Sequence, residues 1–342
     1  MNKVRIAVVG AGRLGGFHAD KIAASEQSEL AGVYDPVPAA ARRLAEKHGV
    51  KVFGSLGEIL PETDGVVVAA PSTEHGRLGK FFLTNGRHLL MEKPVATTAD
   101  EAGALAAEAV ARNLVLMAGH VEQCNPAWHA ALPALREIAS EGGGVIDAVR
   151  TSPYSFRCVD VGVVLDVMIH DLELVLSLVQ SPVANVRASG FVQFGGHEDV
   201  CTAYVEFANG VTARFFASRV ERAPVREMNA FGRARRVRVD FAKRTAEIIA
   251  TDPAILAGDY APEKIVYSEI LPALPTFMKD HYRVEFHEKS PVDALALEEE
   301  RFAGMIAAKM GGAPCQEFHD KGVDAVVLAG RILDLLRTGQ AG

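Results

Sequence analysis

The fold is decided by the stretch VRIAVVGAGRLGGFH, residues 4–18. Residues 4–9 are mostly apolar and β-branched, a pattern typical of a buried strand. Gly10, Gly12 and Gly15 follow, and the residues after them predict a helix. A strand that enters a helix through a glycine turn begins a βαβ unit, and such units build parallel sheets.

The same alternation of strand and helix continues to residue 120. Strands are predicted at residues 28–36, 64–71, 87–94 and 114–120, and helices at 38–49, 74–86 and 98–113. The strands are continuously apolar, which favours a parallel sheet covered by helices on both faces. We therefore predict an N-terminal Rossmann domain, a doubly wound parallel sheet, over residues 1–121.

From about residue 145 the pattern changes to strands with alternating polarity that are joined by short turns. This pattern indicates a largely antiparallel, open sheet with one covered face. Residues 163–180 predict a helix within it, and the segments 296–312 and 321–339 predict two more. The second domain is predicted as α/β over residues 122–342, with C-terminal helices able to pack back on the first domain.

Composition narrows the class of protein. The chain of 342 residues carries a formal net charge of -7, which argues against nucleic acid or an anionic membrane as a partner. No apolar run approaches a membrane span. The four cysteines are scattered without a CxxC pair, which favours reduced thiols in the cytoplasm.

The glycine turn predicts a dinucleotide site. The spacing Gly10-x-Gly12-x-x-Gly15 lets a pyrophosphate approach backbone N–H groups at a helix N-terminus, beside Arg13 and Leu14. Asp35 ends the second predicted strand, where a carboxylate accepts hydrogen bonds from ribose hydroxyls and repels a 2′-phosphate. We therefore predict NAD rather than NADP. The alternative is a glycine turn without a nucleotide.

A second signal is the Glu92-Lys93-Pro94 sequence at the end of the fourth predicted strand. The carboxyl edge of a parallel sheet is where open α/β folds bind ligands. Pro94 disfavours helical geometry at Lys93 and so restricts where its ammonium lies. A lysine there is able to exchange a proton with a substrate hydroxyl while a hydride leaves the same carbon. We predict that Lys93 is catalytic.

The third signal lies in the predicted helix 163–180. Asp166 and His170 are four residues apart and therefore share a helix face. A histidine next to a carboxylate suits a substrate hydroxyl. The competing interpretations are a helix that merely packs on the sheet, or a metal site. We predict no metal here, because a third ligand at a characteristic spacing is missing. We also predict none at His120 and Cys124, where a strand end followed by a turn explains the residues.

With these motifs the chain resembles the Gfo/Idh/MocA oxidoreductases over nearly its whole length, through GAGRLGGFH, VYDP, AAPSTEHGRLG, MEKP and LDVMIHDLEL. The resemblance implies a Rossmann domain, a second domain whose open sheet forms dimer or tetramer contacts, and catalysis by Lys93, Asp166 and His170. The cofactor contacts that we assign on this basis, besides the glycine turn and Asp35, are Pro71, Ser72, His75, Glu92 and Lys93.

The stretch GHVEQCNPAW, residues 119–128, is similar to that of the nucleotide-sugar 3-dehydrogenases of this family. It implies an NAD-dependent oxidation of a ring secondary hydroxyl, at C3 of a nucleotide-linked amino sugar. The predicted substrate contacts are Glu122, Asn125, Arg157 and His170. Glu122 and Asn125 could instead cap the following helix, and Arg157 could be a surface cation. The alternatives for function are a dehydrogenase of a free polyol or aldose, such as an inositol, and a non-catalytic NAD-binding protein.

Overall fold

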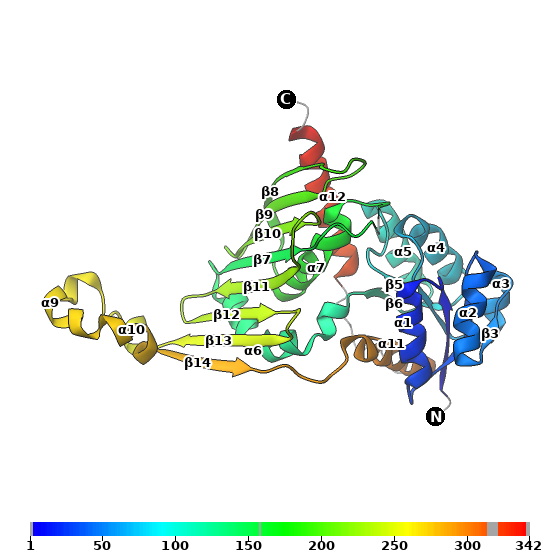
Figure 1. Ribbon diagram of the computed structural model, residues 1–342, viewed down its shortest axis with the longest axis horizontal. Coiled ribbons are helices and arrows are strands. Elements are labelled where there is room, and N and C mark those ends of the chain that lie inside the picture. The colour runs from blue at the N-terminus through cyan, green and yellow to red at the C-terminus, as the bar shows by residue number, and fades with distance from the viewer. Residues whose placement is uncertain (1–2, 157–158, 313–320, 340–342) are drawn as a thin grey trace.

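The computed structural model describes residues 3–156, 159–312 and 321–339 (Figure 1). Its first half contains a parallel sheet of six strands in the order β3-β2-β1-β4-β5-β6. The strands are β1 (Val4–Val9), β2 (Ser28–Tyr34), β3 (Lys51–Val52), β4 (Gly65–Val68), β5 (His88–Glu92) and β6 (Leu116–Gly119). This strand order is that of a dinucleotide-binding Rossmann sheet.

Alternate residues of each strand face opposite sides of the sheet and belong to two separate cores. Ile6 and Val8 pack with α1 (Arg13–Ala24), α2 (Pro38–His48) and the C-terminal α11 (Ala294–Met310). Ala7 and Val9 face the side covered by α4 (His75–Thr84) and α5 (Ala99–Ala111). The short helices α3 (Leu56–Ile59), η1 (Leu60–Glu62) and η2 (Ser72–Glu74) complete this half. The predicted doubly wound arrangement is confirmed.

The register of the sheet positions the site. Val9 lies opposite Tyr34 and Val68, Val68 lies opposite Met91, and Glu92 lies opposite Gly119. Parallel strands end at the same edge, so the residues that follow four of these strands gather there. They are Gly10, Asp35, Lys93 and His120.

The second half contains a sheet of eight strands in the order β14-β13-β12-β11-β7-β10-β9-β8, antiparallel except where β7 pairs with β10. The strands are β7 (Val145–Thr151), β8 (Val183–Phe191), β9 (Val200–Phe207), β10 (Thr212–Ser218), β11 (Val225–Phe231), β12 (Arg235–Asp240), β13 (Thr245–Thr251) and β14 (Tyr282–His287). One face is covered by α6 (Pro126–Glu141), α7 (Ile169–Leu178) and α12 (Gly322–Gly339). The predicted largely antiparallel open sheet is confirmed.

The C-terminal helices connect the two halves. In Figure 1, α11 lies beside α1 of the first sheet, whereas α12 lies along α7 and β8. α11 also packs against η3 (Val121–Cys124), the single turn that follows β6. A domain boundary at residue 121 remains a prediction.

Three features differ from the sequence prediction. The helix expected over residues 163–180 consists of a π-helical turn, η4 (Val164–Met168), followed by α7. Strands β3, β13 and β14 were not predicted, nor was the helical arm between β13 and β14. The arm consists of α8 (Pro253–Leu256), η5 (Pro262–Lys264), α9 (Tyr267–Ile270), η6 (Leu271–Ala273) and α10 (Leu274–His281), and it extends away from the body (Figure 1).

In the described ranges, no helix is long and apolar enough to cross a membrane.

Candidate active site

The glycine turn between β1 and α1 leaves room for a pyrophosphate. Gly10 has φ +100, and a Cβ there would meet the Ala69 carbonyl oxygen at 2.5 Å. A Cβ at Gly15 would meet the Gly10 carbonyl oxygen at 1.8 Å, so both positions require glycine. A Cβ at Gly12, by contrast, would meet nothing within 4 Å among the described residues, so this side of the turn is open to a ligand.

The N-terminus of α1 suits an anion. Gly12 is the N-cap residue of α1, and within the described chain no side chain caps this end of the helix. The N–H groups of the first turn, which begins with Arg13 and Leu14, therefore face the open side. Asp35 lies across the turn: Oδ2 accepts from the Ala11 N–H at 2.7 Å, and Oδ1 accepts from the Val37 N–H at 2.8 Å. A carboxylate oxygen accepts more than one hydrogen bond, so Asp35 retains capacity for ribose hydroxyls. The turn therefore fits a dinucleotide.

Lys93 and Asp166 meet across the two halves of the chain. Lys93 directly follows β5, and its Nζ donates to Asp166 Oδ1 at 2.9 Å and to the Asp166 carbonyl oxygen at 2.7 Å. Both side chains are largely but not fully covered, with 16% and 21% of their surface exposed. Two of the three ammonium N–H groups are thus directed at η4, which restricts the direction of the third.

Two uncharged imidazoles lie next to this pair. The ring centroids of His120 and His170 are 6.2 Å apart in an edge-to-face arrangement. Burial lowers the pKa of His120 to about 3. Burial, followed by the charge of Lys93, lowers the pKa of His170 well below its usual value. Both rings are neutral at pH 7, and in the described part of the chain the His120 nitrogens and His170 Nδ1 have no hydrogen-bond partner. They remain able to bond a polar ligand.

Glu92 is held by a buried histidine behind the site. His18, fully buried, contacts Glu92 Oε1 through Nε2 at 2.8 Å and Glu299 Oε1 through Nδ1 at 2.5 Å. The other Glu92 oxygen, Oε2, accepts from the backbone N–H of Lys93 at 3.1 Å. The continuous chain Glu299–His18–Glu92 therefore ends on the backbone of Lys93, whose peptide bond to Pro94 is cis.

A second buried network lies under η3. Arg150 donates to both oxygens of Asp171 and, at 2.8 Å, to Glu122 Oε1. Asn125 Oδ1 accepts from the Ala127 N–H at 3.0 Å and thus caps α6, while its Nδ2 donates to Glu122 and Phe241. Glu122 and Asn125 thus make contacts within the protein, and Asn125 has the capping contact that was the alternative; their substrate roles remain a prediction.

The remaining predicted residues lie around the same edge. His75 is buried, and its ring nitrogens face the carbonyl oxygens of Pro94 and Ala70 at 2.6 and 3.0 Å. His75 therefore ties the segment after Pro71 to the one after Lys93. The Ser72 N–H donates to Asp160 at 3.0 Å. Pro71 lies at the turn before η2. Arg157 lies outside the described residues.

In the described ranges, one group of histidine and carboxylate ligand atoms is close enough to share a metal ion, namely that of His18, Glu92 and Glu298. The His120 and Cys124 pair is not part of it. Both nitrogens of His18 already meet carboxylate oxygens at hydrogen-bond distance, so the contacts of this group are those of a proton-sharing network.

Comparison with known proteins agrees with this geometry. Residues 4–120 match the oxidoreductase family with an NAD-binding Rossmann fold, and residues 147–247 match the GFO/IDH/MocA C-terminal domain. The chain belongs to the Gfo/Idh/MocA oxidoreductase family. NAD is its cofactor, as the glycine turn and Asp35 predicted.

Relatives with assigned activities cover nearly the whole chain. UDP-N-acetylglucosamine 3-dehydrogenase of Acidithiobacillus ferrooxidans is 34% identical over 308 residues, 90% of either chain. A solved structure of that enzyme superposes with a TM-score of 0.81 at 32% identity over 99% of both chains. Scyllo-inositol 2-dehydrogenase (NAD(+)) of Bacillus subtilis is 25% identical over 322 residues, 89% of this chain and 86% of its own.

Sequence reasoning missed several side chains of this Gfo/Idh/MocA site. Glu299 gave no local signal, because it lies in an acidic run of α11 and meets His18 only through the tertiary fold. Arg150 did give a local signal. In β7, Ile146, Ala148 and Arg150 are alternate residues and therefore face the same, buried side of the sheet, where a cation requires a buried partner.

Proposed function

We propose that this protein is an NAD-dependent dehydrogenase that oxidises a ring secondary hydroxyl of a sugar. The proposal rests on the contact between Lys93 and Asp166, 2.9 Å, at the sheet edge that also carries the dinucleotide turn. Charged groups at this edge, with two neutral imidazoles beside them, suit a reaction in which a proton and a hydride leave the same CH–OH group.

Each catalytic residue has a distinct role in the proposal. The bound NAD supplies the hydride acceptor. Lys93, in its amine form, takes the hydroxyl proton during oxidation and, as an ammonium, returns it during carbonyl reduction. Asp166 holds the Nζ of Lys93 toward the substrate, and His170, which is neutral, hydrogen-bonds the reacting hydroxyl.

A nucleotide-linked amino sugar oxidised at C3 is the substrate class that we infer. It is supported by the 34% identity to UDP-N-acetylglucosamine 3-dehydrogenase over 90% of both chains. The relation to an inositol dehydrogenase, at 25% identity, keeps a free polyol or aldose as the second candidate. A non-catalytic NAD-binding protein would not require the contact between Lys93 and Asp166.

The test is NADH formation with UDP-N-acetylglucosamine, its uronic acid, free hexoses and inositols. We expect turnover with a nucleotide sugar and little with the free compounds. Turnover of a free polyol with none of any nucleotide sugar would overturn the substrate assignment but not the dehydrogenase. If no substrate of the panel is oxidised while NAD binds, the silent NAD-binding alternative is favoured. Arg157→Ala then tests whether Arg157 contacts the diphosphate.

The setting of the enzyme is also part of the proposal. We infer a cytoplasmic homo-oligomer, a dimer or tetramer, whose partners are small molecules. The net charge of -7 and the scattered cysteines support this setting, and Cys124 and Cys201 are buried free thiols. The boundary at residue 121 is proposed as the point where the dinucleotide domain ends, directly after β6.

A further inference from the structure

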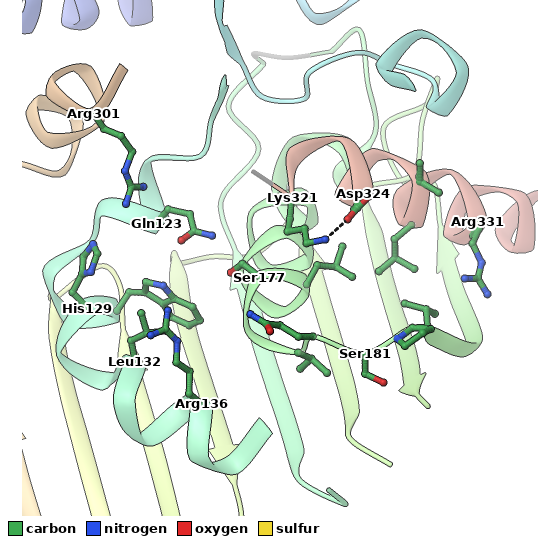
Figure 2. A pocket seen from close by; sticks show the side chains of 18 residues that line it. Gln123, His129, Leu132, Arg136, Ser177, Ser181, Arg301, Lys321, Asp324 and Arg331 are labelled. Atoms are coloured by element: carbon green, nitrogen blue, oxygen red, sulfur yellow. Dashed lines mark hydrogen bonds and ion pairs between the residues drawn. The ribbon is translucent and has the colours of Figure 1, made fainter. Parts of the chain in front are cut away.

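A cavity of about 810 Å³ on the helix-covered side of the second sheet does not bring its cations together (Figure 2). Arg136 and Arg331 lie at opposite ends of it in Figure 2, and Lys321 pairs with Asp324 at 2.7 Å. Among the described residues, the cavity therefore has no cluster of cations that would hold an anion. A different cation, Arg226, lies at the candidate active site.

Arg226 of β11 lies directly opposite Arg150 of β7 in the antiparallel register. Opposed residues of an antiparallel pair place their side chains on the same face. Here it is the helix-covered face, because Met228 and Ala230, which alternate with Arg226 along β11, are both fully buried. Arg226 itself is exposed, one residue from the start of the strand. It therefore lies at the rim of the covered face.

Backbone contacts hold this rim next to the turn that follows β6. The Phe241 N–H donates to the carbonyl oxygen of Arg226 at 2.9 Å, and the Phe241 carbonyl oxygen accepts from Asn125 Nδ2 at 3.2 Å. The ring of Phe241 lies 5.4 Å from the guanidinium carbon of Arg150. Arg226 is thus fixed beside the buried network under η3.

The charge of Arg226 acts on the candidate catalytic residues. Arg150 donates to both oxygens of Asp171, the residue that follows His170. Burial, then the charges of Lys93 and Arg150, lower the pKa of His170 most, and the charge of Arg226 acts in the same direction. An exposed cation that contributes to the field at His170 is close enough to meet another part of a substrate bound there.

Arg226 differs from other arginines of the second sheet in its pairing. Arg150 of β7, Arg187 of β8 and Arg214 of β10 each pair with a carboxylate. In the described part of the chain, no carboxylate forms an ion pair with Arg226. Like charges directly opposite each other destabilise a sheet, so a cation across from the buried Arg150 favours a bound anion.

We propose that Arg226 binds an anionic group of the substrate, a phosphate of the nucleotide or the carboxylate of a sugar acid. The proposal rests on the proposed function, because a free polyol or neutral aldose carries no such group. A guanidinium donates two parallel hydrogen bonds to either anion. The contact is remote from the reacting carbon and is made before and during the reaction, so its loss raises KM more than it lowers kcat.

The test uses the full chain saturated with NADH, which fills the glycine turn and prevents oxidation of the ligand. UDP and the uronic acid of UDP-N-acetylglucosamine are titrated by calorimetry. We expect Arg226→Gln to weaken binding by about tenfold or more, the usual effect of losing a charge-assisted hydrogen bond, and Arg226→Lys to restore part of the loss.

Arg236→Gln is the matched control. Arg236 is an exposed arginine of the neighbouring strand β12 and, within the described ranges, also has no ion pair. It lies opposite Phe231 and therefore on the other, open face of the sheet.

Weaker binding of UDP to Arg226→Gln but not to Arg236→Gln supports the proposal and assigns the contact to a phosphate. A loss confined to the uronic acid supports it and assigns the contact to the carboxylate. Unchanged affinity for both ligands, equal losses in both variants, or no binding of either ligand to wild type overturns it. Turnover on the substrate panel is measured separately, so a nucleotide-sugar dehydrogenase that does not use Arg226 would be recognised as such.

Discussion

At the residue scale, the site combines a lysine that a carboxylate holds in place with two imidazoles that burial keeps neutral. Lys93 is paired with Asp166 at 2.9 Å, whereas burial leaves His120 and His170 neutral. The Lys93 side chain, held in place next to neutral imidazoles, is the group that we favour for proton transfer, since His170 at pH 7 is far less basic than an ordinary histidine.

We expect Lys93→Met to lower turnover by about 10²–10⁴-fold, the usual contribution of general acid–base catalysis. Met keeps most of the stem volume, and NAD binding should persist because the glycine turn is untouched. Steady-state rates and NAD titration by fluorescence measure both effects. Near-normal turnover of Lys93→Met would assign the proton transfer to His170 instead. Lys80→Met, which changes an exposed lysine of α4, serves as the control.

Asp35 should determine coenzyme choice. We expect Asp35→Ser to weaken NAD binding and to bring the affinity for NADP closer to that for NAD. Both the ribose contact and the repulsion of a 2′-phosphate are removed in this variant. The ratio of kcat/KM for the two coenzymes measures the change. If the unmodified enzyme prefers NADP, the role assigned to Asp35 is wrong.

At the element scale, α11 brings residues from the C-terminal part of the chain to the site. It packs on α1 and η3 and brings Glu299 to His18. Burial alone would lower the pKa of His18, but hydrogen bonds to Glu299 and Glu92 outweigh burial and raise it well above 6.5. The groups around this imidazole are Glu92 of β5 and Glu298 and Glu299 of α11.

This raised pKa has a definite consequence for stability. The folded state holds the proton more tightly than the unfolded state, so the stabilisation is complete below about pH 6.5 and is lost as pH rises through the folded pKa. We expect His18→Gln to cost about 3–5 kcal/mol near neutral pH, as when one partner of a buried ion pair is removed.

Urea unfolding of wild type and His18→Gln at pH 7 and 9.5 measures this difference. Wild type should lose more stability than the variant over that interval. His48→Gln, which removes a contact with Asp20 outside the His18 network, is the control and should follow wild type. Equal declines in wild type and His18→Gln would contradict the assigned charge of His18.

At the scale of the whole molecule, the face of the second sheet opposite α6, α7 and α12 is open. Tyr204 of β9, Arg214 of β10 and Asp147 of β7 lie in one row across it, in register. Tyr204 is 47% exposed, and Phe231 on the same face is 40% exposed. Exposed aromatic side chains on a sheet face are typical of an interface.

We expect the protein to elute as a multiple of its 36.5 kDa chain mass in size exclusion with light scattering. Tyr204→Arg should shift the population toward the single chain, because a charge would be buried at the contact. Val110→Arg, on an exposed position of α5, is the control. A monomeric wild type would refute the predicted oligomer.

The sequence by itself determined the doubly wound first domain, the antiparallel character of the second, the cofactor turn, and Lys93, Asp166 and His170 as candidates. These follow from local pattern: glycine spacing, the apolar period of each strand, and residues placed at strand ends. The π-helical turn at Asp166 and the arm between β13 and β14 had no such pattern, since the first is a local irregularity of a helix and the second lacks strong periodicity.

Only the tertiary structure decided which charges meet. Glu299 reaches His18 across 281 positions, and Arg150 draws Glu122 and Asp171 into the interior. Such contacts depend on how helices and sheets pack, and a linear pattern carries no information on the distance between remote side chains. Burial then sets the charge of each group, because desolvation acts on an ionisable side chain only after the fold has enclosed it.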